Sequence, residues 1–255
     1  MLGAPSDRLV RTTLVREGHA GVTTYACPMF TFGRRRPVTY VLGQPVKSFP
    51  EIAPEVERGN ILRITEIGES VLHAPCREVT HFGTPELAQL VDDLFTTMFV
   101  AEGVGLAAPQ VGVDLRVFVY DVEDENEDRH VGHVVNPVLE VFDGPEDEIE
   151  ESDEGCLSIP GAYSPLARPV KAIVRGFDQH GKPVELTGSH FLGRALQHEA
   201  QHLDGTLYFD HLTPAAQEAV IAEMHRERPG VLEERLELSE ALGKTPAEYP
   251  EAPLR

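Results

Sequence analysis

The strongest constraint on this chain is a pair of histidines four residues apart in the segment QHEAQH (197–202). On an α-helix, residues at i and i+4 share one face, with Cβ atoms roughly 5 to 6 Å apart, so His198 and His202 can both reach one tetrahedral cation. The surrounding residues include the apolar side chains Phe191, Leu192, Ala195, Leu196 and Leu203. A helix so wrapped is buried, and buried imidazoles need partners, which a metal supplies. We therefore predict a metal-binding helix over about 189–203.

Glu199 is the candidate general base of this site. It follows His198 directly, and its carboxylate can accept a proton from water that the metal activates. A catalytic metal site of this kind has three protein ligands and one open position. The extended zinc-endopeptidase form HExxHxxGxxH is excluded, because Tyr208 stands where its third histidine would be. Glu218 or Glu223, downstream of the pair, remains open as the third ligand.

Three further helices are indicated by capping residues and apolar spacing. The clearest opens at Thr84-Pro85-Glu86, where a capping residue precedes a proline and an acid, and it ends at Gly103. A second is predicted from Thr213-Pro214 to about residue 228, and a short third helix from 231 to 242, because Pro229 is expected to interrupt the helical pattern.

The strand pattern points to an α+β fold. Runs rich in β-branched and aromatic residues predict strands at 115–121, 131–142, 172–178 and 184–189. Their short connections favour antiparallel pairing. The acid-rich runs 121–128 and 143–154 are predicted to be solvated loops, because like charges at that density keep a segment in water. We expect small, mostly antiparallel sheets around the metal-binding helix.

The length and charge pattern suggest three parts. We divide the 255 residues into a basic N-terminal extension (1–58), a catalytic domain (59–212) and a C-terminal helix with an acidic tail (213–255). The extension is rich in arginine and poor in acids, as in the run Arg34-Arg35-Arg36. A disordered tail or a mistaken upstream start is the simplest interpretation, and an organelle transit peptide is the alternative.

Composition excludes several classes of protein. A formal net charge of -20 argues against a nucleic-acid-binding surface, and no run approaches the roughly 18 apolar residues of a membrane span. The 3 cysteines are far apart and odd in number, which argues against a disulfide framework and indicates a reducing compartment. No secretory signal opens the sequence, so we expect a cytoplasmic protein.

Three motifs occur in order along the chain: GVGLAAPQ (103–110), EGCLS (154–158) and QHEAQH (197–202). Together they resemble the three ordered motifs of the peptide deformylases, over roughly Ile61 to Leu212. The resemblance implies removal of the formyl group from N-formylmethionyl nascent polypeptides, with release of formate. It also implies ferrous iron as the usual metal, with zinc, nickel or cobalt as replacements. Among partners we expect transient ribosome contact, and no membrane or specific nucleic acid.

The resemblance also assigns the catalytic residues. A lone cysteine is more often buried packing than a ligand, but in this family the cysteine that matches Cys156 completes the metal site with His198 and His202. The Gln110 side-chain amide and the Leu157 backbone N–H then face the oxyanion that develops during hydrolysis. A thiolate with two imidazoles is a ligand set that suits ferrous iron or zinc.

The substrate site implied by the resemblance is the loop 103–106. Gly103 and Gly105 lie along the substrate, and Gly105 offers backbone hydrogen bonds. Val104 and Leu106 are candidate neighbours of the pocket for the methionine side chain, with core packing as the alternative. Two glycines and two apolar side chains at these positions are compatible with a substrate pocket and with core packing.

The chain departs from the family pattern in two places. Gln201 stands where many members carry Asp, which changes a group near the metal ligands from charged to neutral. The stretch 161–163 (GAY) replaces one that in some members carries a substrate-contacting Arg. The alternative functions are that of a zinc endopeptidase of the HExxH type and that of a catalytically degenerate, ribosome-associated paralogue.

Overall fold

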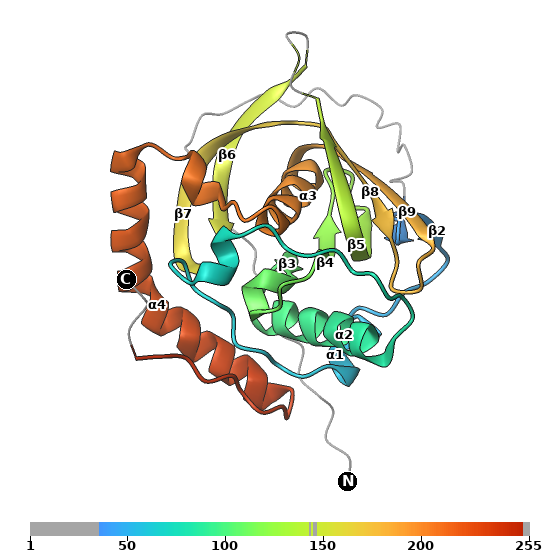
Figure 1. Cartoon of the computed structure of the whole chain (residues 1–255), viewed down its shortest axis with the longest axis horizontal. Helices are drawn as coiled ribbons and strands as arrows, with labels where there is room; N and C mark the ends of the chain where they lie inside the picture. Colours follow the sequence, from blue (N-terminus) through green and yellow to red (C-terminus); the bar gives the residue numbers. More distant parts are fainter. Residues whose placement is uncertain (1–35, 143, 145–146, 252–255) are drawn as a thin grey trace, which may run out of the picture. The chain divides into compact units, whose positions relative to one another are not determined.

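The computed structural model describes residues 36–142, 144 and 147–251, and the elements below belong to them. The strands form a seven-stranded sheet and a two-stranded sheet (Figure 1). The larger sheet contains β1 (Thr39–Val41), β2 (Gln44–Val46), β3 (Gly105–Ala107), β4 (Val117–Glu123), β5 (Arg129–Val141), β8 (Ala172–Phe177) and β9 (Pro183–Gly188). The smaller contains β6 (Ile149–Cys156) and β7 (Ile159–Pro169). All pairings are antiparallel except that of β1 with β5, which confirms the predicted fold class.

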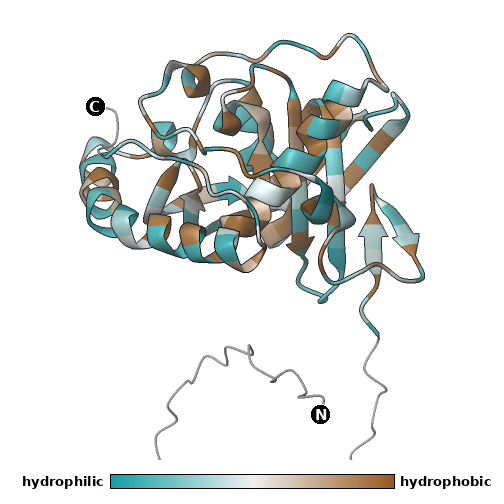
Figure 2. Cartoon of the chain, turned by 90° about the horizontal axis from the view of Figure 1, so that it is seen from below, coloured by the Kyte–Doolittle hydropathy of each residue, from teal (hydrophilic) through white to brown (hydrophobic). Residues whose placement is uncertain are grey.

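The helices are α1 (Pro54–Arg58), α2 (Pro85–Val100), α3 (His190–Leu203) and α4 (Pro214–Ala241). Short 3₁₀ turns complete the chain at Ser70–His73, Ala108–Val111 and Tyr208–His211. Figure 2 shows hydrophobic and hydrophilic residues alternating along the helices, as expected for helices with one buried face. Among the described residues, no helix is both long enough and apolar enough to span a membrane.

Strand β4 lies between α2 and α3, and its alternating side chains fill both cores. Val117 and Val119 join the core cluster under α2, whereas Phe118 and Tyr120 join the cluster under α3. Successive side chains of a strand point to opposite faces, so a continuous apolar run is what a strand covered on both faces requires. This arrangement places α3 centrally, against the sheet.

Helix α2 forms as the sequence predicts. The Thr84 side chain accepts a hydrogen bond from the Leu87 N–H, and a proline occupies the first turn. The apolar stripe is buried in the core: Leu87, Leu90, Val91, Leu94, Phe95 and Met98. The helix therefore provides one wall of the fold and leads into the segment 103–110.

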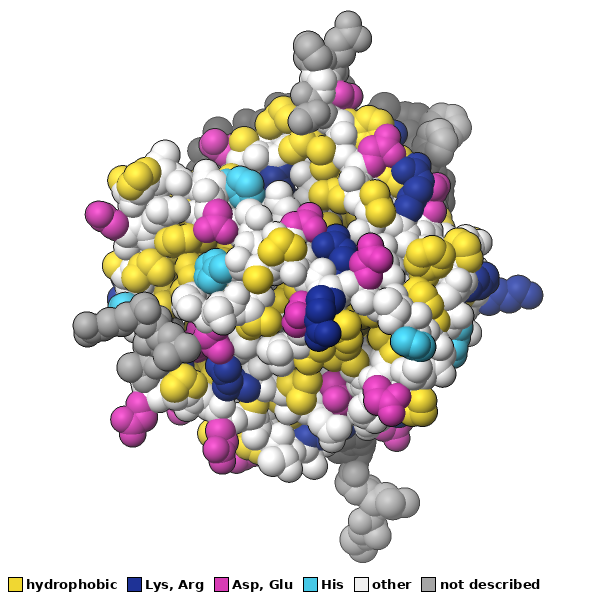
Figure 3. All heavy atoms as spheres, viewed as in Figure 1, with side chains coloured by type: hydrophobic (Ala, Val, Ile, Leu, Met, Phe, Trp, Pro, Cys, Tyr) yellow, Lys and Arg dark blue, Asp and Glu magenta, His cyan; other side chains and the backbone are white. Residues whose placement is uncertain are grey.

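The acid-rich run 143–154 was predicted to be a solvated loop, and for its second half this prediction is wrong. Its second half belongs to β6, which pairs with β7. The prediction failed because the charge density of one segment takes no account of partners from other elements. In the fold, Arg168 of β7 and Arg194 of α3 both donate hydrogen bonds to the buried Glu154. The other carboxylates of β6 face water. Figure 3 shows Asp and Glu side chains scattered over one face of the molecule rather than gathered into one patch.

Helix α4 is one element rather than the two that Pro229 led us to predict. A proline inside a helix removes one backbone hydrogen bond and clashes with the preceding turn, and α4 bends (Figure 1). The helix continues because side chains before and after Pro229 are buried by tertiary packing, including Met224 and Arg235. Residues 36–58, assigned to the extension from sequence, contain β1, β2 and α1, and the run Arg34-Arg35 lies outside the described residues.

Candidate active site

Cys156, His198 and His202 converge on one point. Their ligand atoms all lie within 4.8 Å of one another. The Cys156 Sγ lies 3.2 Å from His202 Nε2, which lies 3.2 Å from His198 Nε2. The three residues are 8%, 9% and 0% exposed, respectively. A sulfur and two imidazole nitrogens brought together in a buried site form the donor set of a divalent transition metal, so the residues fit such an ion.

Local structure explains this convergence. The histidines lie one turn apart on α3, and Cys156 ends β6, where the pairing with β7 shifts register between Gly155 and Cys156. Such an irregularity re-aims a side chain at the end of a strand. A Cβ at Gly155 would lie 2.5 Å from the ring of Tyr163, so a larger residue there would displace that exposed side chain.

A buried carboxylate supports the first histidine. Glu154 accepts a hydrogen bond from His198 Nδ1 at 2.7 Å, from Arg168 at 2.6 and 2.5 Å, and from Arg194 at 2.8 Å. Burial alone would raise the pKa of Glu154, but the hydrogen bonds from Arg168 and His198 outweigh it and hold the pKa well below its usual value. The ionised carboxylate fixes the His198 ring so that Nε2 faces the cluster.

Sequence reasoning missed this support. The sequence does place Glu154 two residues before Cys156, which could have suggested a role near the metal site. Its partners, however, come from β7 and α3, which are distant in the sequence, so no local pattern indicates the hydrogen bonds. Gln201 also proves to be one step removed from the cluster, since its Oε1 accepts a hydrogen bond from Arg168 Nη1 at 3.0 Å. It therefore reaches His198 through Arg168 and Glu154.

Glu199 is buried beside the cluster. It is 4% exposed, and its Oε2 has no hydrogen-bond partner among the described residues. Burial raises the pKa of Glu199 to about 7. The strand alternation of β3 turns Gly105 toward this carboxylate, and a Cβ at Gly105 would collide with it. A carboxyl of this pKa in a dry site can take up and release a proton near neutral pH.

Gln110 is held with its amide N–H₂ toward the cluster. Its Oε1 accepts a hydrogen bond from the Ala107 N–H at 2.8 Å, which leaves Nε2 facing Ser158 Oγ at 3.3 Å and Cys156 Sγ at 3.5 Å. Leu157 occupies the turn between β6 and β7, directly after Cys156. These two residues therefore lie beside the sulfur ligand.

A cleft of about 380 Å³ opens onto the cluster. Its lining includes most of the residues predicted from sequence: Gly103, Val104, Gly105, Gln110, Cys156, Leu157, His198 and Glu199. Leu106 is not in the lining, because it points to the other side of β3 and is fully buried in the core under α2. His202 lies beneath the surface of the cleft, at 0% exposure. Glu218 and Glu223, the other candidate ligands, are outside the cluster.

Comparison with known proteins gives one family. The sequence model of the polypeptide deformylase family matches residues 61–218. Peptide deformylase 1 of Streptomyces avermitilis is 48% identical over 173 residues, which cover 68% of this chain and 80% of that protein. Peptide deformylase 2 of the same organism is 51% identical over 156 residues, covering 61% of this chain and 82% of that protein.

Solved structures give the same result. The peptide deformylase of Ehrlichia chaffeensis superposes with a TM-score of 0.60 at 30% identity, covering 68% of this chain and 99% of that one. The enzyme from Legionella pneumophila gives 0.58 at 35% identity, covering 66% and 96%. The matched segment contains Gln110, Glu199 and the cluster of Cys156, His198 and His202. The chain therefore belongs to the peptide deformylase family, whose members are metal-dependent hydrolases that remove the N-formyl group from nascent polypeptides.

Proposed function

We propose that this chain hydrolyses the formyl amide of N-formylmethionyl peptides in the cleft above α3, with Cys156, His198 and His202 holding one divalent cation. The observation that carries the proposal is the convergence of these three buried donors beside a carboxylate whose pKa is raised to about 7. When bound, the cation supplies a Lewis acid that lowers the pKa of water and polarises a carbonyl.

Glu199 is the proton carrier of the proposed reaction. Its unpartnered Oε2 accepts a proton from the attacking water as the new bond to the formyl carbon forms. The same proton then passes to the nitrogen of methionine as the C–N bond breaks. Formate and a free α-amino group leave, so Glu199 returns to its ionised form without any other proton source.

Gln110 and Leu157 are the proposed donors to the formyl oxygen. As negative charge develops on that oxygen, the Gln110 amide and the Leu157 backbone N–H stabilise it, each by on the order of 3 kcal/mol. The bond from Ala107 to Gln110 Oε1 supports this role, because it sets the orientation of the amide before substrate arrives. Gly103, Val104 and Gly105 of the cleft lining are proposed to hold the peptide.

The identity of the metal is a further part of the proposal. Ferrous iron is favoured, with zinc, nickel or cobalt as replacements, because one thiolate and two imidazoles suit these ions. We also propose transient contact with the ribosome, where the substrate emerges, and action in the cytoplasm. The division into residues 1–58, 59–212 and 213–255 stays a proposal, and limited proteolysis tests it.

Formate release from formyl-Met-Ala-Ser by anaerobically iron-loaded protein tests the function. We expect turnover by the unaltered chain and none above background by Glu199→Ala. Glu218→Ala is the matched control, since Glu218 is an exposed carboxylate on α4 and its loss should leave the rate unchanged. Equal formate release by the Glu199→Ala variant would refute the proposal. A zinc endopeptidase, the alternative, would instead cleave internal peptide bonds and is not favoured by the family match.

A further inference from the structure

We propose that Arg235 of α4 is a positioning residue for the deformylation reaction, acting through the Leu157 carbonyl and hence on the backbone conformation of Leu157. The inference rests on the proposed role of Leu157 as an oxyanion donor. It assigns a function in turnover to a helix that lies almost entirely beyond the family match, which ends at residue 218.

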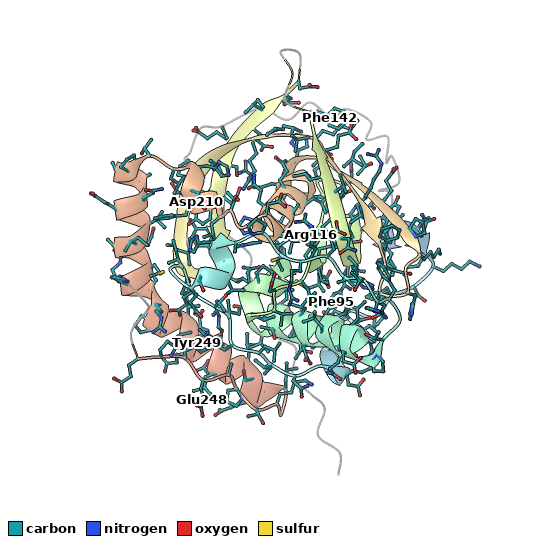
Figure 4. The ribbon with its side chains drawn as sticks, viewed as in Figure 1. Phe95, Arg116, Phe142, Asp210, Glu248 and Tyr249 are labelled. Atoms are coloured by element: carbon teal, nitrogen blue, oxygen red, sulfur yellow. The ribbon has the colours of Figure 1, made fainter. Side chains whose placement is uncertain are left out.

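The contact that carries the inference joins α4 to the turn after Cys156. Arg235 Nη2 donates a hydrogen bond to the Leu157 carbonyl at 3.1 Å. The guanidinium is also held from its other side, where Nη1 bonds to the Tyr249 hydroxyl at 3.2 Å and the Tyr249 ring centroid lies 5.7 Å from the guanidinium carbon. Figure 4 shows Tyr249 beside α4, where the chain folds back along the helix.

Three hydrogen bonds hold the turn. The Ser158 N–H, in the same peptide group as the Leu157 carbonyl, donates to the Cys156 sulfur at 3.4 Å. The Ser158 carbonyl accepts the Ile67 N–H at 2.9 Å. The Leu157 carbonyl itself is held by the side chain of Arg235. The Leu157 N–H lies in the preceding peptide group, which is joined to the held one at the Leu157 Cα. Fixing the peptide group after Leu157 therefore restricts the orientation of this N–H before substrate binds, which is the property that an oxyanion donor requires.

The charge of Arg235 points to a role beyond stability. The side chain is 5% exposed, lines the active-site cleft, and has no carboxylate partner among the described residues. Its Nε is buried without a hydrogen-bond partner. Burying a cation in this way costs free energy. Arg228, seven residues earlier on the same helix and equally buried, is by contrast paired with Glu66 at 2.8 Å.

An unpaired cation at this position favours the negative charge of the reaction. The formyl oxygen becomes anionic next to Leu157, on the same cleft that Arg235 lines. In a poorly solvated site, a fixed positive charge lowers the energy of such an anion more than it would in water. Arg235 therefore helps to orient the donor and adds a positive charge to a cleft that Glu102, Asp153 and Glu234 also line.

The test compares Arg235→Met with Tyr249→Phe in the full-length, nickel-loaded protein, using formyl-Met-Ala-Ser. Arg235→Met keeps a long apolar side chain but loses the bond to Leu157, and we expect kcat to fall by about tenfold or more, with KM and bound nickel within about twofold. Tyr249→Phe removes the hydroxyl on the far side of the same guanidinium, so it weakens the docking of the C-terminal segment while sparing the bond to Leu157. Because the ring of Tyr249 and the bond from Arg235 Nη2 to Leu157 remain, we expect a smaller fall in kcat than in Arg235→Met.

Arg235→Lys keeps the charge and provides a rescue that a structural role would not predict. We expect its kcat to lie below that of the unaltered chain and above that of Arg235→Met. The comparison with the unaltered chain keeps the test open if Arg235→Met does not fold. If kcat were unchanged in Arg235→Met or in Arg235→Lys, the proposed role of Arg235 would be wrong, while the proposed function of the chain would stand. Equal losses of kcat in Arg235→Met and Tyr249→Phe would also overturn it. No turnover by the unaltered chain would overturn the proposed function as well.

Discussion

Removing the charge of Glu154 should destabilise both the fold and the metal site. The carboxylate is 4% exposed and is shared by Arg168 and Arg194, which are 4% and 7% exposed. Glu154→Gln keeps the volume and an acceptor for His198 but leaves two buried guanidinium groups without a counter-charge. Removing one partner of a buried ion pair costs about 3 to 5 kcal/mol, so we expect a loss of about 3 kcal/mol in the free energy of unfolding.

The metal site should weaken at the same time. Groups that orient a metal-ligating histidine typically change metal affinity by about 10- to 100-fold, so we expect a rise of at least tenfold in the dissociation constant. Urea unfolding of the metal-free protein measures the first effect, and competition with a chelator measures the second. Glu185→Gln is the matched control, because it removes a carboxylate that pairs with Arg175 on the surface, where Arg175 also keeps Glu140 as a partner. A Glu154→Gln variant no less stable than this control would refute the reasoning.

Three further predictions concern other residues. Gly105→Ala should lower kcat by more than tenfold while retaining bound metal, since the added Cβ collides with the Glu199 carboxylate; formate release and metal analysis check this. Burial lowers the pKa of His133 to about 4, and its Nε2 accepts the Gln179 N–H. Below pH ~6.5 the unfolded chain therefore binds a proton on His133 that the folded chain does not bind until about pH 4, so about 3 kcal/mol of the free energy of unfolding should be lost between pH ~6.5 and ~4. The loss should be smaller in His133→Gln, and urea unfolding at each pH measures it. Iron-loaded protein should lose activity in air while nickel-loaded protein keeps it, since a ferrous thiolate site is open to oxidation; equal lifetimes would argue against iron.

Local signals were enough to predict the central elements. The capping threonine, the proline after it and the apolar stripe predicted α2, and the two histidines within an apolar segment predicted α3 as a buried helix. These elements were accessible because the information lies within one or two helical turns. The same holds for β4, β5, β8 and β9 of the larger sheet, whose runs of β-branched and aromatic residues predicted them.

The elements that sequence reasoning missed depend on contacts between distant residues. The acid run became β6 because Arg168 and Arg194 approach it from other elements, and α4 continued past Pro229 because its inner face packs on β7. The tie between Arg235 and Leu157 spans the same kind of distance. Charge counting and proline rules describe isolated segments, so they err where tertiary packing outweighs local preference.

The most direct test of the account measures bound metal and formate release on the same preparations. For the unaltered chain we predict one divalent ion per chain and turnover of formyl-Met-Ala-Ser. Cys156→Ala should lose the ion and the activity together, whereas Glu199→Gln should keep the ion and lose the activity. Full metal retention by Cys156→Ala, or undiminished turnover by Glu199→Gln, would contradict the assignment of Cys156, His198 and His202 as ligands with Glu199 as base.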